Sequence, residues 1–193
     1  MWFFTGKGDG GESNLFNGRR LPKSEEIFDL IGTLDEATAS IGLCISLTEE
    51  EELKKILIEI QDDLSKLMGR IAGADDKAIG SRFDLVEVLE KTERLTQEFG
   101  HHLDNPNAFI YSGKSTLGAS LDICRTVIRR AEREAVRALK KSSDKKNILA
   151  YINRLSSLLF VLRLTIIKKI HNPEPPDFVY NQDVRRADIF ISF

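Results

Sequence analysis

Hydrophobic residues recur every three or four positions along most of the chain, the spacing typical of amphipathic helices. The pattern is clearest between residues 49 and 72, where Leu53, Leu57, Ile60, Leu64, Leu67 and Ile71 alternate steps of four and three. This spacing favours a helix packed nearly antiparallel to a neighbour. The same reasoning predicts five helices, at about residues 24–47, 49–72, 83–99, 115–141 and 144–170. No strand pattern of any length and no internal repeat is apparent.

Short connections between long amphipathic helices place consecutive helices antiparallel, so we expect an all-α fold, a five-helix bundle. A chain of 193 residues fits a single domain over residues 1–193. Three regions lie outside the expected helices: an N-terminal segment (about 1–23), a loop (101–113) and a C-terminal tail (about 172–193). Both end segments carry aromatic side chains that we expect to dock on the bundle or on a second subunit: Trp2, Phe3, Phe4, Phe178, Tyr180, Phe190 and Phe193.

The composition is that of a globular protein. Hydrophobic residues make up 41% and charged residues 30%, with a formal net charge of -2, so nothing indicates a nucleic-acid or membrane partner. No apolar run approaches the roughly 20 residues of a membrane span, and the N-terminus lacks the features of a signal peptide, so we expect a cytoplasmic protein. Cys44 and Cys124 lie within apolar helical patterns and are interpreted as core thiols.

The N-terminal segment contains a glycine-rich stretch with the chemistry of a phosphate site. Four of the six residues from Gly6 to Gly11 are glycines, and Lys7 lies among them. Thr5 and Ser13, which carry hydroxyls, lie on either side. Glycines expose backbone N–H groups, and successive N–H groups form a nest for anions. The alternative is an ordinary flexible turn. Neither this stretch nor Ser112–Ser115 matches the spacing of a P-loop.

The predicted fourth helix is rich in arginine. Its Arg125, Arg129, Arg130, Arg133 and Arg137 surround Glu132 and Glu134. Arg129 and Arg133 are four residues apart and share a face, so two guanidinium groups could clamp a polyphosphate. The alternative is a solvated face of ion pairs.

Polar residues also interrupt the predicted first and fifth helices. Asp35 and Glu36 lie inside an apolar pattern, where Asp35 either faces solvent or pairs with an arginine of another helix. Asn153 and Ser156 lie beside an apolar stripe, which indicates a ligand or subunit surface or a partly exposed flank. His101 and His102 have no partner at metal-ligand spacing, so we assign no metal or nucleophilic site to protein side chains.

Five segments resemble, in order, the motifs of one known family. The segments are Thr5–Leu15 for T-K-T-G-D-x-G-T-T-S-L, Arg20 to Lys23 for the end of G-x-x-R-x-x-K, Ile31–Gly42 for Y-G-T-x-D-E-L-N-S-x-I-G, Cys124–Arg133 for A-R-T-x-x-R-R-A-E-R, and Asn153–Phe160 for N-R-L-S-D-x-L-F. The family is that of the PduO-type ATP:cob(I)alamin adenosyltransferases, which the chain resembles over about residues 3–163. Asp122 stands where the family has a histidine, and Ser157 where it has an aspartate.

The resemblance implies a homotrimer of five-helix bundles with ATP and corrinoid sites between subunits. It implies transfer of the 5′-deoxyadenosyl group of ATP to the cobalt of cob(I)alamin, with Mg²⁺ bound through the phosphates. The implied ATP-binding residues are Thr5, Gly6, Lys7, Gly8, Asp9, Gly11, Ser13, Asn14, Lys23, Arg129, Arg130, Glu132, Arg133 and Asn153. Asp35 is implied to pair with Arg129 and fix it near the corrinoid, these two being the catalytic pair, whereas Arg125 is implied to be structural.

From the resemblance we also expect two partners, a cob(II)alamin reductase and an adenosylcobalamin-dependent enzyme. Two other interpretations of the same residues stay open. One is a non-catalytic carrier that binds ATP and adenosylcobalamin and delivers the cofactor. The other is a helical oligomerisation module whose arginines form ion pairs.

Overall fold

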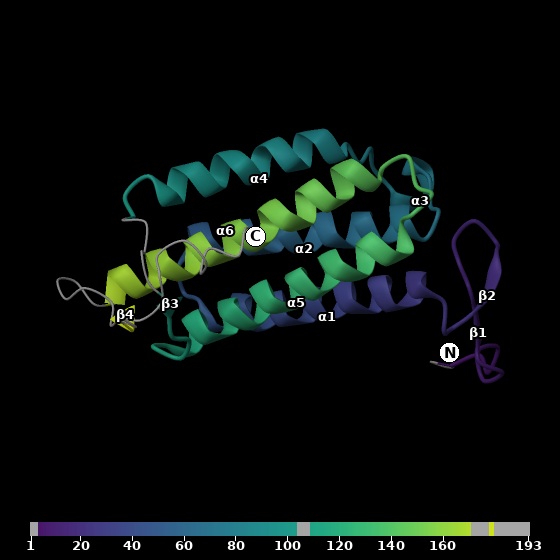
Figure 1. Cartoon of the computed structure of the whole chain (residues 1–193), viewed down its shortest axis with the longest axis horizontal. Helices are drawn as coiled ribbons and strands as arrows, with labels where there is room; N and C mark the ends of the chain where they lie inside the picture. The colour runs from purple at the N-terminus through teal and green to yellow at the C-terminus, as the bar shows by residue number, and fades with distance from the viewer. Residues whose placement is uncertain (1–3, 104–108, 171–177, 180–193) are drawn as a thin grey trace.

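The chain folds mainly into helices. The computed structural model describes residues 4–103, 109–170 and 178–179. In these residues five long helices are present, together with a four-residue helix, α3 (Asp76–Ile79). The long helices are α1 (Glu26–Leu47), α2 (Glu51–Ile71), α4 (Leu85–Gly100), α5 (Thr116–Ala138) and α6 (Lys145–Ile170). They lie side by side along one long axis (Figure 1), which confirms the predicted predominance of helices.

The order of the helices in space differs from their order in the sequence. Helix α1 packs between α2 and α5, and α6 packs between α5 and α4. Helices α1 and α5 are therefore neighbours although α2, α3 and α4 lie between them in the sequence. This contact places the acidic residues of the first helix beside the arginine-rich helix.

One core runs through the bundle, and each long helix contributes the apolar face that its periodicity predicts. Fully buried members include Leu34, Leu57, Leu64, Leu121, Ile128, Ile152 and Leu159. Cys44 of α1 and Cys124 of α5 are both buried and free, with their Sγ atoms 3.5 Å apart. The expectation that these cysteines are core thiols is confirmed.

Two short antiparallel ribbons flank the helices, so the expectation of no strands was wrong. Strand β1 (Glu12–Asn14) pairs with β2 (Arg20–Pro22), with Ser13 opposite Leu21. Strand β3 (Phe109–Ile110) pairs with β4 (Phe178–Val179). Strands of two or three residues are too short to show an alternating pattern, and this is why the sequence does not reveal them.

The ends of the helices differ from the predicted ends by a few residues, as is usual. Helix α4 begins at Leu85 because the Asp84 carboxylate accepts a hydrogen bond from the backbone N–H of Val86 at 3.0 Å. It runs through Gly100, the predicted stop. Helix α5 is capped by Ser115, whose hydroxyl accepts from the Gly118 N–H at 3.0 Å.

Two helices are long and apolar enough, by length and composition alone, to cross a membrane. They are α1 and α6, so the expectation that no such segment exists was wrong by this criterion. Most of the apolar part of α6 is buried inside the bundle, as in the core helix of a soluble protein, whereas about a third of that of α1 is buried. Such helices are weak evidence for a membrane location.

The predicted docking of the end aromatics can be judged at two residues. Phe4 is 73% exposed, so most of its side chain is not covered. Phe178 lies in β4 opposite Ile110 of β3, so this part of the tail contacts the segment that precedes α5. Trp2, Phe3 and the tail residues Tyr180, Phe190 and Phe193 lie outside the described residues.

Candidate functional site

The glycine-rich N-terminal segment folds into successive tight turns. The N–H of Asp9 donates to the Gly6 carbonyl at 3.2 Å, and the N–H of Gly11 donates to the Gly8 carbonyl at 3.1 Å. Gly6 and Gly11 have φ angles of 68° and 80°, a region that residues with a side chain rarely adopt. Glycine is therefore required at these two turns.

Two residues hold this loop in shape, Arg20 in β2 and Lys23 just after that strand. Arg20 forms an ion pair with Glu12 at 2.8 Å, and its Nη2 donates to the Lys7 carbonyl at 2.9 Å. The Lys23 N–H donates to the Gly11 carbonyl at 2.7 Å. A Cβ atom on Gly8 would lie 3.0 Å from the Lys23 ammonium nitrogen. The loop thus brings Lys23 against the glycines with which the resemblance groups it.

Most predicted ligands in the loop are open to solvent. Thr5, Gly6, Lys7, Asp9, Gly11 and Asn14 are exposed, and Gly8 and Ser13 are half-buried. The Thr5 hydroxyl accepts from the Lys7 N–H at 3.4 Å. The loop accordingly presents polar atoms outward while its shape is maintained from within.

The loop is fixed to one end of the bundle. Leu15 is buried, and the N–H of Phe16 donates to the Ala72 carbonyl at the end of α2 at 2.9 Å. In Figure 1 the β1–β2 ribbon projects beyond the end of the bundle where α1 begins. The second half of α5, which carries Arg129 and Arg133, runs toward the same end, because Lys140 just beyond α5 bonds to Glu26 at the start of α1 at 3.5 Å.

The predicted arginine cluster forms one continuous face of α5. Arg129 and Arg130 are half-buried and Arg133 is exposed, and Arg133 Nη1 donates to the Arg129 carbonyl at 3.0 Å. Burial lowers the pKa of Arg129, and the nearby charges of Arg125 and Arg133 lower it further, although Glu132 opposes them. Crowded guanidinium groups of this kind are stabilised by an anion.

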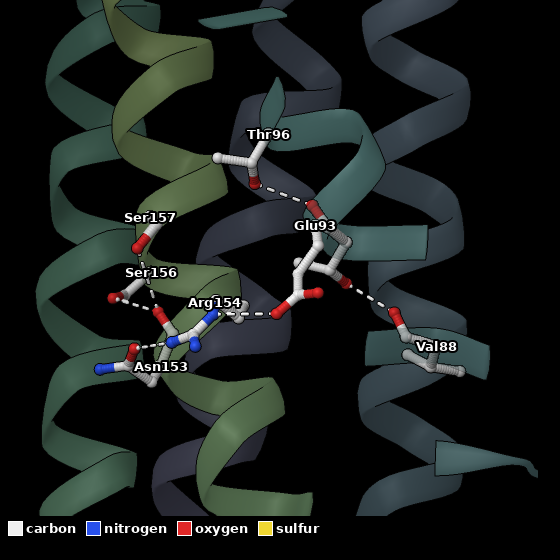
Figure 2. Close-up of polar contacts among 8 residues, drawn as sticks. Val88, Glu93, Thr96, Asn153, Arg154, Ser156 and Ser157 are labelled. Carbon is white, nitrogen blue, oxygen red and sulfur yellow. Dashed lines mark hydrogen bonds and ion pairs between the residues drawn. The ribbon is translucent and has the colours of Figure 1, made fainter. Parts of the chain in front are cut away.

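Glu132 and Asn153, two predicted ATP ligands from different helices, contact each other. The Asn153 side-chain amide donates to Glu132 Oε1 at 3.1 Å. Arg154 Nη1 donates to Asn153 Oδ1 at 2.7 Å, and Arg154 Nε donates to Glu93 Oε1 on α4 at 3.1 Å (Figure 2). A polar chain therefore runs from α4 across α6 to α5.

The acidic residue of α1 that reaches α5 is Glu36, which forms an ion pair with Arg130. The sequence reasoning placed Asp35 in this role, and Asp35 is exposed. Neighbouring positions of a helix differ by about 100° in direction, so the sequence alone does not identify which of the two acids meets α5. The proposed pairing of Asp35 with Arg129 stays a prediction.

A second charge cluster lies deeper in the molecule. Arg163 of α6 is 1% exposed, and its Nε lies 2.8 Å from Asp122 Oδ2 on α5. Its Nη2 donates to the Tyr111 carbonyl at 2.6 Å, and Arg125 contacts Asp122 at 3.3 Å. Burial lowers the pKa of Arg163, while the Asp122 charge opposes this effect. Asp122 thus has two arginine partners.

Other features of the described residues are less suited to bind ATP. A hollow of about 360 Å³ beside α2 is lined by Phe16, Ile31, Met68 and Ile79 among others, but by none of the predicted ATP ligands. No group of three or more His, Cys, Asp or Glu residues that could hold a metal ion occurs in the described residues. The loop and the arginine face remain the residues best suited to bind a polyphosphate.

Comparison with known proteins agrees with these features. A family model described as cobalamin adenosyltransferase matches residues 3–166. The human corrinoid adenosyltransferase MMAB is 33% identical over 178 residues, which cover 89% of this chain and 71% of that protein. A corrinoid adenosyltransferase of Mycobacterium bovis is 30% identical over 186 residues, 89% of each chain.

The fold also has solved counterparts. A variant of a PduO-type ATP:corrinoid adenosyltransferase from Lactobacillus reuteri, complexed with cobalamin and ATP, superposes with a TM-score of 0.81. It shares 24% identity, and the match covers 93% of this chain and 97% of that one. The two chains therefore have the same fold. With the family match spanning most of the sequence, the chain belongs to the cobalamin adenosyltransferase family.

Proposed function

We propose that the protein transfers the 5′-deoxyadenosyl group of ATP to the cobalt of a reduced corrinoid. The observation that carries this proposal is the crowded arginine face of α5, in which Arg129 has a lowered pKa and Asn153 and Glu132 adjoin it. In the relatives that share this family, the named activity is corrinoid adenosylation. A site with many cationic donors and a preshaped glycine loop suits the binding of a triphosphate.

The reaction needs little from protein acids or bases. Cobalt(I) supplies the electron pair that forms the cobalt–carbon bond. The bond between C5′ and the phosphate oxygen breaks, and triphosphate leaves with the electron pair of that broken bond. The protein's task is to hold both reactants in line, which is catalysis by positioning. Arginines and loop N–H groups would stabilise the charge that develops on the leaving group.

We assign the triphosphate to the N-terminal loop with Lys23, and the rest of the nucleotide site to Arg129, Arg130, Glu132, Arg133 and Asn153. Mg²⁺ bound through the phosphates would neutralise part of their charge. Asp35 and Arg129 would order the corrinoid side. Several exposed apolar side chains, including Leu43, Ile123 and Val136, suit a surface shared between subunits, so we place these sites in a homotrimer.

We further propose a cytoplasmic location and supply of the reduced corrinoid by a cob(II)alamin reductase. The product would pass to an adenosylcobalamin-dependent enzyme. These partners follow from the proposed chemistry, since the substrate must be reduced before the reaction and the product is a cofactor.

The test is an absorbance assay with purified protein, ATP and chemically reduced cobalamin. We expect conversion to adenosylcobalamin over many turnovers, with one triphosphate released for each cobalamin. A single stoichiometric turnover, or binding without conversion, would instead support the carrier. Failure to bind ATP would support the oligomerisation module.

A further inference from the structure

The series of polar contacts that passes through Asn153 to Glu132 begins on a helix that carries none of the predicted ligands. Glu93 lies on α4, Arg154 and Asn153 on α6, and Glu132 on α5. Three hydrogen bonds of 3.1, 2.7 and 3.1 Å connect these four side chains in series. Figure 2 shows the first two of these bonds, with Arg154 between Glu93 and Asn153.

The chemistry of the four groups determines how the Asn153 amide is turned. A guanidinium only donates hydrogen bonds and a carboxylate only accepts them. Arg154 therefore requires the carbonyl oxygen of Asn153, and Glu132 requires its NH₂ group. Reversing the amide would set donor against donor at one end and acceptor against acceptor at the other, so one orientation is strongly favoured.

Arg154 is held on its far side by Glu93. The two side chains are 47% and 43% exposed, and a pair so exposed adds little to the stability of the fold. Without Glu93, however, the Arg154 guanidinium would be drawn toward the Glu132 carboxylate, which is the other negative charge in this hydrogen-bonded series of side chains. It would then compete with Asn153 for that carboxylate.

We propose that Glu93 and Arg154 are positioning residues for the nucleotide site, because together they set the direction of the Asn153 amide and keep Glu132 free of a competing arginine. This inference rests on the proposed function, since it assigns a role within the same ATP site. Neither residue is among those predicted from the sequence to bind ATP. Both act through Asn153 rather than by touching the nucleotide.

The experiment compares ATP affinity by calorimetry and turnover in the full-length protein. Glu93→Ala should weaken ATP binding by about fivefold, and Glu93→Gln, whose amide oxygen can still accept from Arg154, should recover most of that affinity. Glu90→Ala is the matched control, because Glu90 is an exposed glutamate one turn earlier on α4. Its ATP affinity should equal that of the wild type, and all three variants should melt at the same temperature as the wild type.

Two double variants separate a positioning role from a general effect. If Glu93 acts through its neighbours, Glu93→Ala should cause no further loss in an Arg154→Met background, where no guanidinium is left to reach Glu132. In an Asn153→Ala background the loss should be smaller than the full effect, because only the competition of Arg154 for Glu132 remains. Full additivity in either background, or unchanged affinity in Glu93→Ala, would overturn the inference. Wild-type protein that binds ATP but forms no adenosylcobalamin would contradict the proposed function alone, because the affinity comparison needs no corrinoid.

Discussion

The buried ion pair between Arg163 and Asp122 connects α6, α5 and the segment that precedes α5. Arg163 also donates to the Tyr111 carbonyl, so one guanidinium contacts both a carboxylate and a backbone carbonyl. Removing a charge from water is costly, and the cost is recovered only when every polar atom finds a partner. Single substitutions in this pair should therefore harm the protein more than a matched double substitution.

Arg163→Met leaves Asp122 buried with Arg125 as its remaining ion-pair partner among the described residues, and we expect it to cost about 3–5 kcal/mol of unfolding free energy. The double variant Asp122→Leu/Arg163→Met removes both charges and should regain most of that loss. Urea denaturation at one fixed protein concentration measures the difference. A double variant as unstable as the single one would show that the charges themselves are required.

Arg129 tests the catalytic assignment. Lysine keeps the charge but loses the planar fork of donors, so Arg129→Lys should lower the turnover number more than it weakens ATP binding. Asp35→Asn should cause a similar defect, and the double variant should be less than additive if the two residues form a pair.

Arg137→Lys is the control for this comparison, because Arg137 lies two turns further along α5 and forms an ion pair with Glu134. Steady-state kinetics with varied ATP separates the two parameters. Normal turnover in Arg129→Lys would return this helix to the interpretation of a solvated ion-paired face.

At the level of elements, the long helices were predictable and the short ones were not. Helix α2 carries six apolar positions at helical spacing, whereas α3 has only four residues and each strand of the N-terminal ribbon has three. The composition identified the glycine-rich segment. It did not reveal the contacts by which Arg20 and Lys23 maintain the shape of that segment. Those contacts depend on a turn between residues 14 and 20, which brings distant positions together without leaving a periodic pattern.

The N-terminal loop offers a prediction with a built-in comparison. A Cβ on Gly8 would lie 3.0 Å from the Lys23 ammonium, whereas one on Gly10 would meet nothing within 4 Å. Gly8→Val should displace Lys23 and weaken ATP binding by at least about tenfold, or 1.4 kcal/mol, with the bundle still folded. Gly10→Val, also β-branched, should bind ATP like the wild type.

Calorimetry measures both affinities, and circular dichroism checks the helices. Unchanged ATP affinity in Gly8→Val would show that the loop is not part of the site.

At the level of the whole molecule, the proposed homotrimer predicts that the site depends on assembly. The loop projects beyond the bundle, and its described hydrogen bonds run within its own residues and to the end of α2. If loop and arginine face come from different subunits of a closed trimer, two inactive variants can complement each other. One chain alone would then hold no complete site.

We therefore expect co-expressed Gly8→Val and Arg133→Ala chains to recover about a quarter of wild-type activity, because half of the loops and half of the arginine faces are intact in random closed trimers. At ATP concentrations below the dissociation constant of the wild type, each variant alone should have about a tenth of the wild-type activity or less. Sedimentation should give a trimer at micromolar concentration. Mixed assemblies without recovered activity would place the whole site within one subunit.

The packing of α1 against α5 has a consequence for synthesis of the chain. Helix α1 ends at Leu47 and α5 ends at Ala138, so 138 − 47 = 91 residues must be added before the whole of its partner exists. At roughly 5–20 residues per second, translation takes about 5–18 s to cover that distance. Throughout this interval the apolar face of α1 that will meet α5, including Cys44, is not yet covered by the whole of that helix, so the face is open to association with other chains.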